Sequence, residues 1–212
     1  MTSIAIIDYG MGNLRSVAKA FEHIAPQARV FVTQNRHDIL QADRVVFPGQ
    51  GSIRDCMREL AHWHLMDVVR DAALGKPFLG LCPGPQALLE FSEENGGTEC
   101  LKVLPGRVAW FGDLRDPATG ERLKVPHMGW NQVHQSRDHP LWRGIPQDSR
   151  FYFVHSYYPQ PADPTLVAGQ TCYGFDFASA IARDNIFAVQ FHPEKSAQAG
   201  LRLLANFVDW NP

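Results

Sequence analysis

The chain has 212 residues, of which 45% are apolar and 20% are charged, and its formal net charge is −2. These totals are ordinary for a soluble globular protein. A charge so close to zero gives no reason to expect nucleic acid or an anionic membrane as the main partner. The length fits one well-cored domain, so we expect a single domain over residues 1–212.

The cysteines indicate where the protein works. Cys56, Cys82, Cys100 and Cys172 are widely spaced and form no CxxC pair. This spacing predicts neither a zinc site nor a disulfide framework, and it fits a reducing compartment. No basic region precedes the first apolar run, and no run approaches the roughly 20 apolar residues that span a bilayer. We therefore expect a cytoplasmic protein without a metal ion.

The first half of the chain alternates strands with helices. Leu14, Val17, Phe21 and Ile24 recur at helical spacing, and Asn13 before them is a plausible helix N-cap. A second helical stretch, of one or two helices, is expected over residues 52–74. Strands are expected over residues 3–8, 28–33, 44–47 and 76–81. This alternation predicts βαβ units and a parallel sheet covered by helices on both faces.

The second half changes to short strands separated by Gly, Pro, Asp and Asn, as in antiparallel hairpins. Such strands are expected at residues 108–111, 123–125, 132–134, 150–154, 166–168, 177–182 and 186–190. A closing amphipathic helix is expected over residues 197–208. The predicted fold class is α/β, with a mixed, largely parallel central sheet flanked by helices and a small antiparallel extension.

Three of the predicted parallel strands end in glycine-rich loops. These loops hold residues 8–12, residues 48–51 and the segment around Cys82. Parallel sheets carry their functional sites beyond the carboxyl ends of the strands. The three loops are therefore expected to share one site.

Cys82 stands at the sharpest of these turns, in the segment KPFLGLCPGPQALL. A strand, a Gly-flanked turn and a helix around one reactive side chain form the pattern of a nucleophile elbow. The free N–H groups at a helix start also favour a thiolate. Taken alone, the segment leaves open that Cys82 is a small buried apolar residue, as most free cysteines are.

A second segment supplies the other two groups that cysteine catalysis needs. The apolar run IFAVQF leads directly into His192-Pro193-Glu194. Proline keeps the preceding residue extended, and residues i and i+2 of an extended chain point to the same side. His192 and Glu194 are therefore presented together, as a general base and the carboxylate that orients it. An isolated pair of this kind is usually a solvated strand end, but the nearby elbow favours catalysis.

These residues resemble a known family. GLCPGPQ and FHPEK are similar to the motifs of class I (triad-type) glutamine amidotransferases. IIDYGMGNLRSV, FPGQG, SEENGG, PHMGWN and RFYFVHSYY narrow the resemblance to the glutaminase subunits of imidazole glycerol phosphate synthase, an enzyme of histidine biosynthesis. The resemblance runs in order from about Ile4 to Phe207, and it implies a flavodoxin-like fold and no cofactor.

The resemblance implies hydrolysis of L-glutamine to glutamate and ammonia through a thioester. Cys82 is then the nucleophile, His192 moves protons and Glu194 orients the imidazole. The substrate-binding positions implied are Gln86, Glu94, Ser156 and Tyr157, and the oxyanion region implied is Gly49, Gln50 and Gly51, after a peptide reorients.

The resemblance also implies a partner. Asn13, Trp130, Tyr152 and Lys195 match positions that face a cyclase subunit with a (β/α)8 barrel, to which ammonia passes within a heterodimer. The aromatic pair Trp130 and Tyr152 is equally compatible with a place in the core or at its rim. His127 is expected to be structural, and His155 has no assigned role.

One residue departs from the family pattern. Pro83 follows the nucleophile, where family members have a residue whose amide helps to stabilise the oxyanion. Loss of one such donor costs about 100- to 1,000-fold in turnover. Pro85 should stiffen the same turn. An alternative function therefore stays open, in which the chain is a catalytically impaired docking or regulatory subunit of an ammonia-using synthase.

Overall fold

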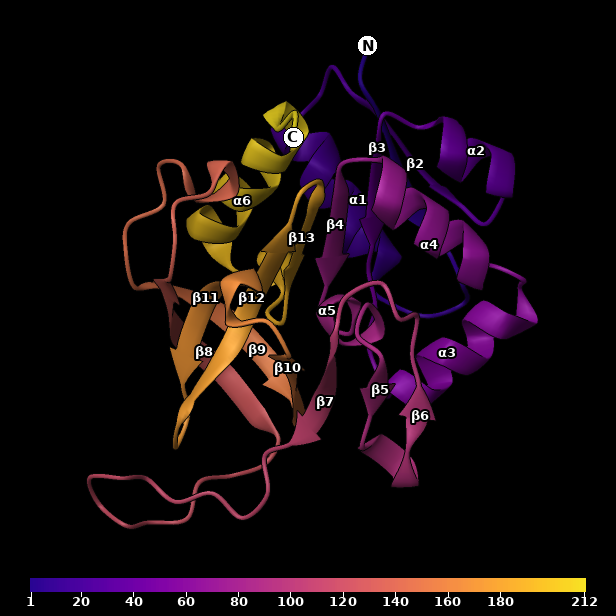
Figure 1. Ribbon diagram of the computed structural model, residues 1–212. Helices are drawn as coiled ribbons and strands as arrows, with labels where there is room; N and C mark the ends of the chain where they lie inside the picture. Colours follow the sequence, from indigo (N-terminus) through magenta and orange to yellow (C-terminus); the bar gives the residue numbers. More distant parts are fainter.

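The structure, a computed structural model, describes residues 1–212 and contains two β-sheets (Figure 1). The large sheet has nine strands in the order β2-β1-β3-β4-β13-β12-β11-β8-β9. These strands are β1 (Ser3–Ile7), β2 (Arg29–Thr33), β3 (Arg44–Phe47), β4 (Phe78–Leu81), β8 (His127–Gln135), β9 (Ser149–His155), β11 (Val167–Cys172), β12 (Asp176–Arg183) and β13 (Ile186–Val189). The small sheet has the order β10-β7-β5-β6 and consists of β5 (Phe91–Ser92), β6 (Thr98–Glu99), β7 (Gly106–Trp110) and β10 (Tyr157–Pro161).

Six α-helices and four short 3-10 helices connect and cover the sheets. The α-helices are α1 (Leu14–Ile24), α2 (Arg36–Gln41), α3 (Ile53–His62), α4 (Met66–Gly75), α5 (Gly84–Ala87) and α6 (Ala197–Asp209). The 3-10 helices are η1 (Glu94–Gly96), η2 (Pro140–Trp142), η3 (Pro164–Leu166) and η4 (Pro193–Lys195). None of the helices has the length and apolar character required to cross a membrane.

The large sheet is parallel at one end and antiparallel at the other. Strands β2, β1, β3, β4 and β13 pair in parallel, whereas β13, β12, β11, β8 and β9 pair antiparallel. The two-residue loop Asp184–Asn185 joins β12 to β13, and Asp184 has a φ of 49°, as tight hairpins require. The predicted mixed α/β class is confirmed, with an antiparallel end larger than a small extension.

Alternation along the buried strands produces an apolar core on each face of the large sheet. In β4, Leu79 and Leu81 belong to the core that contains Phe21 of α1 and Phe207 of α6. Phe78 belongs to the opposite core, which is formed with α3 and α4. Burial on both faces explains why β4 reads as a continuous apolar run. The strand that leads to Cys82 is thereby held from both sides.

Most predicted elements of the first half are present, but the helix after Cys82 is shorter than expected. It ends at Ala87, although the apolar pattern continues through Leu88 and Leu89. The carbonyl of Leu88 accepts hydrogen bonds from the N–H groups of residues 103 and 104, and that of Leu89 accepts one from residue 102. These bonds direct the chain into the small sheet instead of into a further helical turn.

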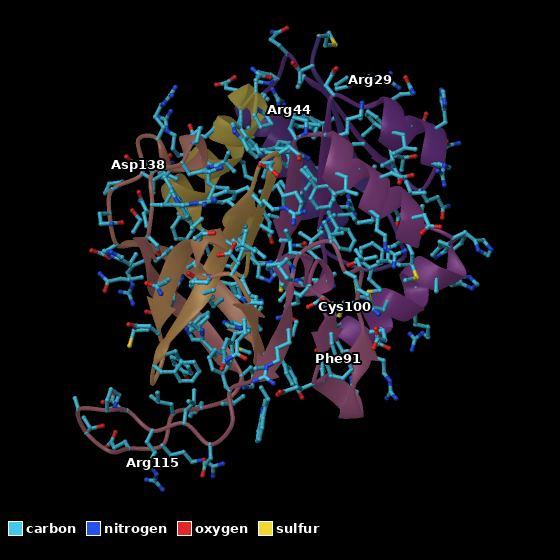
Figure 2. All side chains as sticks on the ribbon, in the orientation of Figure 1. Arg29, Arg44, Phe91, Cys100, Arg115 and Asp138 are labelled. Atoms are coloured by element: carbon cyan, nitrogen blue, oxygen red, sulfur yellow. The ribbon has the colours of Figure 1, made fainter.

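One further prediction needs correction, and one helix was not predicted. Residues 123–125 are not a strand; they lie in the long connection between β7 and β8, near Arg115 in Figure 2. This connection pairs mostly with itself, since the N–H of Leu123 donates to the carbonyl of Leu114. Helix α2 was not predicted. The side chain of Asn35 begins it by accepting from the N–H groups of residues 37 and 38.

Candidate active site

The three glycine-rich loops meet at the carboxyl ends of β1, β3 and β4, which are neighbours in the large sheet. A cavity of about 580 Å³ opens at this edge. Its lining brings together residues from all three loops and from the second half of the chain: Met11, Gln50, Gly51, Cys82, Pro83, Gln86, Glu94, Pro126, Val154, His155, Ser156, Tyr157, Gln190, His192 and Lys195.

Cys82 stands at a strained turn directly after β4. Its φ is 58°, in the left-handed region that non-glycine residues avoid, and only 6% of its surface is exposed. A Cβ at Gly80 would lie 3.0 Å from the Cβ of Ala188 and 3.2 Å from the backbone of Gly84. Glycine at position 80 therefore allows α5 to start directly against β4. This strand–turn–helix geometry is that of a nucleophile elbow.

His192 and Glu194 lie together on the turn that follows β13. The Nδ1 of His192 is 2.8 Å from Oε1 of Glu194, and their side chains are 2% and 0% exposed. The N–H of His192 also donates to the carbonyl of Tyr152 in β9. The imidazole is thus held by the hydrogen bond at Nδ1 and by the hydrogen bond of the His192 backbone. Its other nitrogen, Nε2, has no hydrogen-bond partner within the chain.

Charge in this cluster is stabilised by its neighbours. Burial disfavours the imidazolium form of His192, but the negative charge at Cys82 and the hydrogen-bonded Glu194 outweigh burial and raise the pKa of His192. Burial likewise disfavours the carboxylate of Glu194. Hydrogen bonds from His192 and Asn13 outweigh it and keep the pKa of Glu194 below its ordinary value. The arrangement suits a histidine that takes up and returns a proton beside a thiol.

Asn13 has a different role from the one that its position before α1 suggests. It occupies the N-cap position, but its side chain makes no capping hydrogen bond. Its Nδ2 donates to Oε1 of Glu194 at 2.5 Å. The prediction that Asn13 is the N-cap residue is confirmed for its position, but its side chain does not cap the helix. The competing interaction is a charge-assisted hydrogen bond to a buried carboxylate, which is stronger than a neutral one.

The four predicted substrate-binding residues all line the cavity. Nε2 of Gln86 donates to Oε1 of Gln190 at 2.8 Å and to the carbonyl of Tyr157 at 3.0 Å. Oε2 of Glu94 accepts the N–H of Ile53 at 2.6 Å, at the start of α3. Burial raises the pKa of Glu94 in spite of this bond. Both side chains are thus held in place at the cavity wall.

Gln190 is a site residue that the sequence reasoning missed. Its Nε2 donates to the carbonyl of Cys82 at 3.1 Å, and its Oε1 accepts from Gln86. It is fully buried and links the elbow to the cavity wall. The available signal was a polar residue in the otherwise apolar run IFAVQF, two positions before His192 and therefore on the same side.

The predicted oxyanion region lies beside Cys82 and is free of hydrogen bonds. No N–H or carbonyl of Gly49, Gln50 or Gly51 is paired within the chain. A Cβ at Gly49 would lie 2.3 Å from Cγ of Pro83 and 2.4 Å from the hydroxyl of Tyr9. Position 49 therefore has room only for glycine. Pro83 packs against this segment but offers no N–H of its own.

Trp130 and Tyr152, which were expected to face a partner, lie outside the cavity. They are directly opposite each other in β8 and β9, with ring centroids 6.2 Å apart. Trp130 is 45% exposed, and Met128 on the same strand is 61% exposed. The exposure of Trp130 is inconsistent with the alternative that it is a core residue. Lys195 is exposed and lines the cavity.

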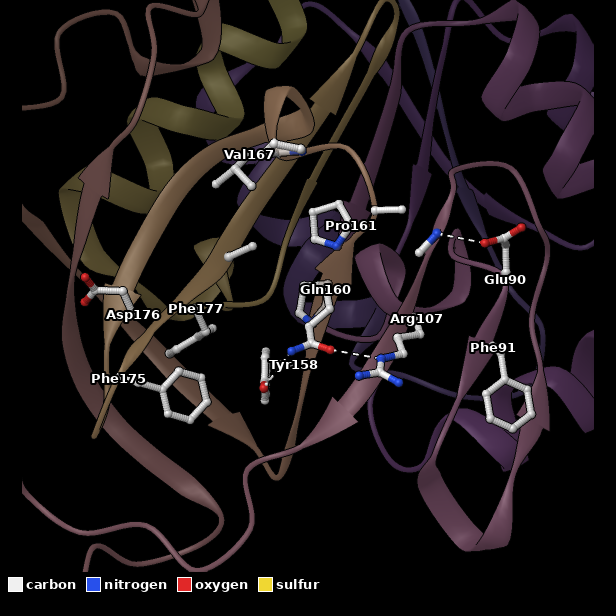
Figure 3. A pocket seen from close by; sticks show the side chains of 15 residues that line it. Glu90, Phe91, Arg107, Tyr158, Gln160, Pro161, Val167, Phe175, Asp176 and Phe177 are labelled. Carbon is white, nitrogen blue, oxygen red and sulfur yellow. Dashed lines mark hydrogen bonds between the residues drawn. The ribbon is translucent and has the colours of Figure 1, made fainter.

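A larger cavity of about 950 Å³ lies elsewhere and contains none of the predicted site residues (Figure 3). Aromatic side chains of Tyr158, Phe175 and Phe177 form one part of its wall. Next to Tyr158, Gln160 accepts at Oε1 a hydrogen bond of 3.1 Å from Arg107. No cysteine lies among its lining residues, so its size does not make it the site of the thiol chemistry.

Comparison with known proteins agrees with this geometry. The model of the family "Glutamine amidotransferase class-I" matches residues 5–210. Imidazole glycerol phosphate synthase subunit HisH of Nitrosococcus oceani is 62% identical, over 100% of this chain and 99% of the relative. The protein of the same name from Aromatoleum aromaticum is 61% identical, over 100% of both chains. The chain belongs to the HisH family of class-I glutamine amidotransferases.

Solved structures extend the likeness of this HisH-family chain to more distant proteins. PurLQS from Thermotoga maritima has a TM-score of 0.70 at 15% identity, over 98% of both chains. A glutamine amidotransferase from the same organism has a TM-score of 0.62 at 16% identity, over 93% of this chain and 78% of the other. At such identities the likeness concerns the fold alone.

Proposed function

We propose that the chain is the glutaminase subunit of an imidazole glycerol phosphate synthase and hydrolyses L-glutamine to glutamate and ammonia. The observation that carries this proposal is the elbow cysteine Cys82 on the same cavity as His192, whose Nδ1 is bound to a buried carboxylate. Membership of the HisH family supports the choice of substrate. The proposed unit is a single domain over residues 1–212.

In the proposed mechanism, the Cys82 thiolate attacks the carboxamide carbon of glutamine. His192 gives a proton from Nε2 to the leaving nitrogen, so that ammonia departs and a thioester to Cys82 remains. His192 then takes a proton from water, which attacks the thioester and releases glutamate. Glu194 holds the imidazole in the tautomer that keeps Nε2 towards the reacting atoms. These steps require no cofactor.

The remaining residues of the cavity have binding roles in this proposal. Gln86, Glu94, Ser156 and Tyr157 hold glutamine, and their places on the cavity wall support this role. The unpaired N–H groups of residues 49–51 stabilise the oxyanion once a peptide reorients. Their lack of hydrogen bonds means that reorientation breaks none.

The ammonia is proposed to pass to a cyclase subunit with a (β/α)8 barrel, within a heterodimer. Trp130, Tyr152, Lys195 and Asn13 are the residues proposed to face that subunit. The large apolar side chain of Trp130 is exposed near the site. This exposure supports the proposal that a partner subunit covers the surface there. A cytoplasmic location is consistent with four cysteines that form no disulfide.

The second candidate function is a docking or regulatory subunit with weak or no glutaminase activity. One specific observation favours it, because Pro83 removes the amide that would normally bind the oxyanion. The intact Cys82, His192 and Glu194 favour the active enzyme.

One glutaminase assay separates the possibilities. Glutamate release is measured with the chain alone, with the cyclase subunit, and with the cyclase subunit and its ligand. We expect slow release from the chain alone and a rise when both are added. Full activity without the partner would contradict the coupling, and no activity in the complex would favour the docking subunit.

A further inference from the structure

Two buried histidines lie at the site cavity, and the proposed mechanism uses neither: His155 is part of the cavity wall, and His127 lies behind it. His127 in β8 and His155 in β9 are directly opposite each other in the strand register. Nδ1 of His127 is 2.9 Å from Nε2 of His155, and the two residues are 3% and 7% exposed. A buried pair of polar rings needs all its nitrogens satisfied, and here the surrounding groups satisfy them.

The direction of each hydrogen bond in this pair is determined. Nδ1 of His155 is 2.8 Å from the carbonyl of Tyr157, which can only accept, so this nitrogen carries the hydrogen. Nε2 of His155 must then accept from Nδ1 of His127. Nε2 of His127 in turn accepts from Nδ2 of Asn131 at 3.2 Å. Burial lowers the pKa of His127 to about 4 and that of His155 to about 3, so both rings are neutral.

Aromatic packing fixes the orientation of the first ring. His127 stacks between Phe153 and Tyr173, with centroids 4.8 Å and 4.1 Å away. Asn131 is itself tied to the carbonyl of Cys172 in β11 at 2.9 Å. The chain of hydrogen bonds therefore starts from a rigid part of the large sheet.

This chain ends at a corner of the site cavity. The backbone leaves the large sheet at His155 and enters the small sheet at Tyr157, and Ser156 belongs to neither. The N–H of Ser156, on the cavity wall, donates to no group of the protein. The carbonyl of Tyr157 accepts from both His155 and Gln86. The corner is thus held from the histidine side and from the elbow side.

We propose that His155, oriented by His127, is a positioning residue that holds this corner so that the free N–H of Ser156 meets the carboxylate of an amino-acid substrate. The inference rests on the proposed function, because it requires that an amino acid occupies the cavity. Both nitrogens of His155 are already bonded, so it acts through the backbone and not by touching the reacting atoms.

Two substitutions at one position separate positioning from packing. His155→Phe keeps a ring in the aromatic cluster but removes the donor to Tyr157. His155→Asn loses the ring but places a side-chain N–H at the same number of bonds from the backbone as Nδ1. Positioning predicts that KM for glutamine rises about tenfold in the Phe variant, as for loss of one ordinary hydrogen bond, with kcat unchanged. The Asn variant should stay within about threefold of the parent KM, although it is the less stable of the two.

A merely structural role predicts the opposite order, with the less stable Asn variant impaired more. His139→Phe is the matched control: its ring is also partly buried, with a pKa lowered to about 4 by burial, and it packs on Phe187 away from the cavity. It should leave KM unchanged.

The assay uses the complex with the cyclase subunit and its ligand. Should His155→Phe not fold, His127→Phe takes its place, because it keeps the stack but removes the donor to Nε2 of His155; we expect KM to rise about threefold. An unchanged KM in a folded Phe variant of an active complex overturns the inference alone. Absence of glutaminase activity in the unsubstituted complex overturns the proposed function, whatever the variants do.

Discussion

The two halves of the candidate site are built to different degrees. The half around His192 is buried and hydrogen-bonded: Glu194 accepts from the imidazole, and Asn13 donates to the same carboxylate oxygen. The half that would receive negative charge, residues 49–51 with Pro83, has free N–H groups on one side and no N–H on the other. One half is organised before substrate arrives, and the other is not.

This difference indicates which half of the site would limit turnover. Preorganised donors stabilise a developing charge most, because they do not have to reorient during the reaction. The proton-transfer half meets this requirement, whereas the anion-binding half must first move a peptide. A partner or a substrate that moves this peptide would control the rate without changing the proton-transfer half.

The largest effect is expected from substitution of Cys82, the nucleophile that both halves of the site are proposed to serve. Cys82→Ser should lower glutamine-dependent turnover by roughly 10⁴-fold or more, because an alcohol at this position is a far weaker nucleophile than a thiolate. Synthesis supplied with external ammonia should continue in the complex, which provides the control for folding and assembly. Persistent glutamine hydrolysis would remove Cys82 from the proposed mechanism.

The second test repairs the unorganised half. Pro83→Val restores an N–H next to Cys82, and kcat for glutamine hydrolysis should rise by up to about 100-fold. Pro85→Val is the matched control, because it also relaxes the turn and restores an N–H, but not beside the nucleophile. An unchanged or lower rate in Pro83→Val would mean that another donor already serves the oxyanion. An equal rise in both variants would point to stiffness of the turn as the cause.

The third test weakens the organised half. Asn13→Ala removes the donor to Glu194, and kcat/KM should fall about tenfold, the value of one hydrogen bond to a charged group. The free energy of unfolding should also fall, by roughly 1.5–3 kcal/mol, because a hydrogen bond to a buried carboxylate is lost. The control is Asn35→Ala, whose side chain does cap α2; it should cost about 1 kcal/mol of unfolding free energy and leave turnover unchanged. Equal loss of activity in both variants would indicate a general effect of stability.

Much of this contrast was visible in the sequence. Cys82 and the pair His192 and Glu194 were predicted from local patterns, a turn after a strand and a proline after His192. His192 is extended as predicted, but Glu194 lies in the 3-10 helix η4 and not in an extended segment. Pro83 was recognised as a departure because proline has no N–H in any fold. The parallel pairing of the strands near these residues followed from the alternation of strands and helices, whereas their order in the sheet was not predicted.

The contacts that complete the site could not be predicted in the same way. Gln190 meets the carbonyl of Cys82 from 108 positions away, and Asn13 meets Glu194 from 181 positions away. Such bonds depend on the packing of distant strands and not on any local pattern. The same holds for the end of α5 at Ala87, which is set by hydrogen bonds from residues 102–104.

The last test concerns the stability of the cavity wall at low pH. His155 is neutral in the folded protein, since burial lowers its pKa from 6.5 to about 3. The unfolded chain binds a proton at this residue below about pH 6.5 and the folded chain does not, so the contribution of His155 to folding is lost as the pH falls towards its folded pKa. The slope is about 1.4 kcal/mol per pH unit. The unfolding free energies of the parent and of His155→Phe can be measured with urea between about pH 7 and pH 4 and plotted against pH. The slopes of the two curves should differ by this amount. Parallel curves would show that His155 is already charged, and that the wall beside His192 is less rigid than its hydrogen bonds indicate.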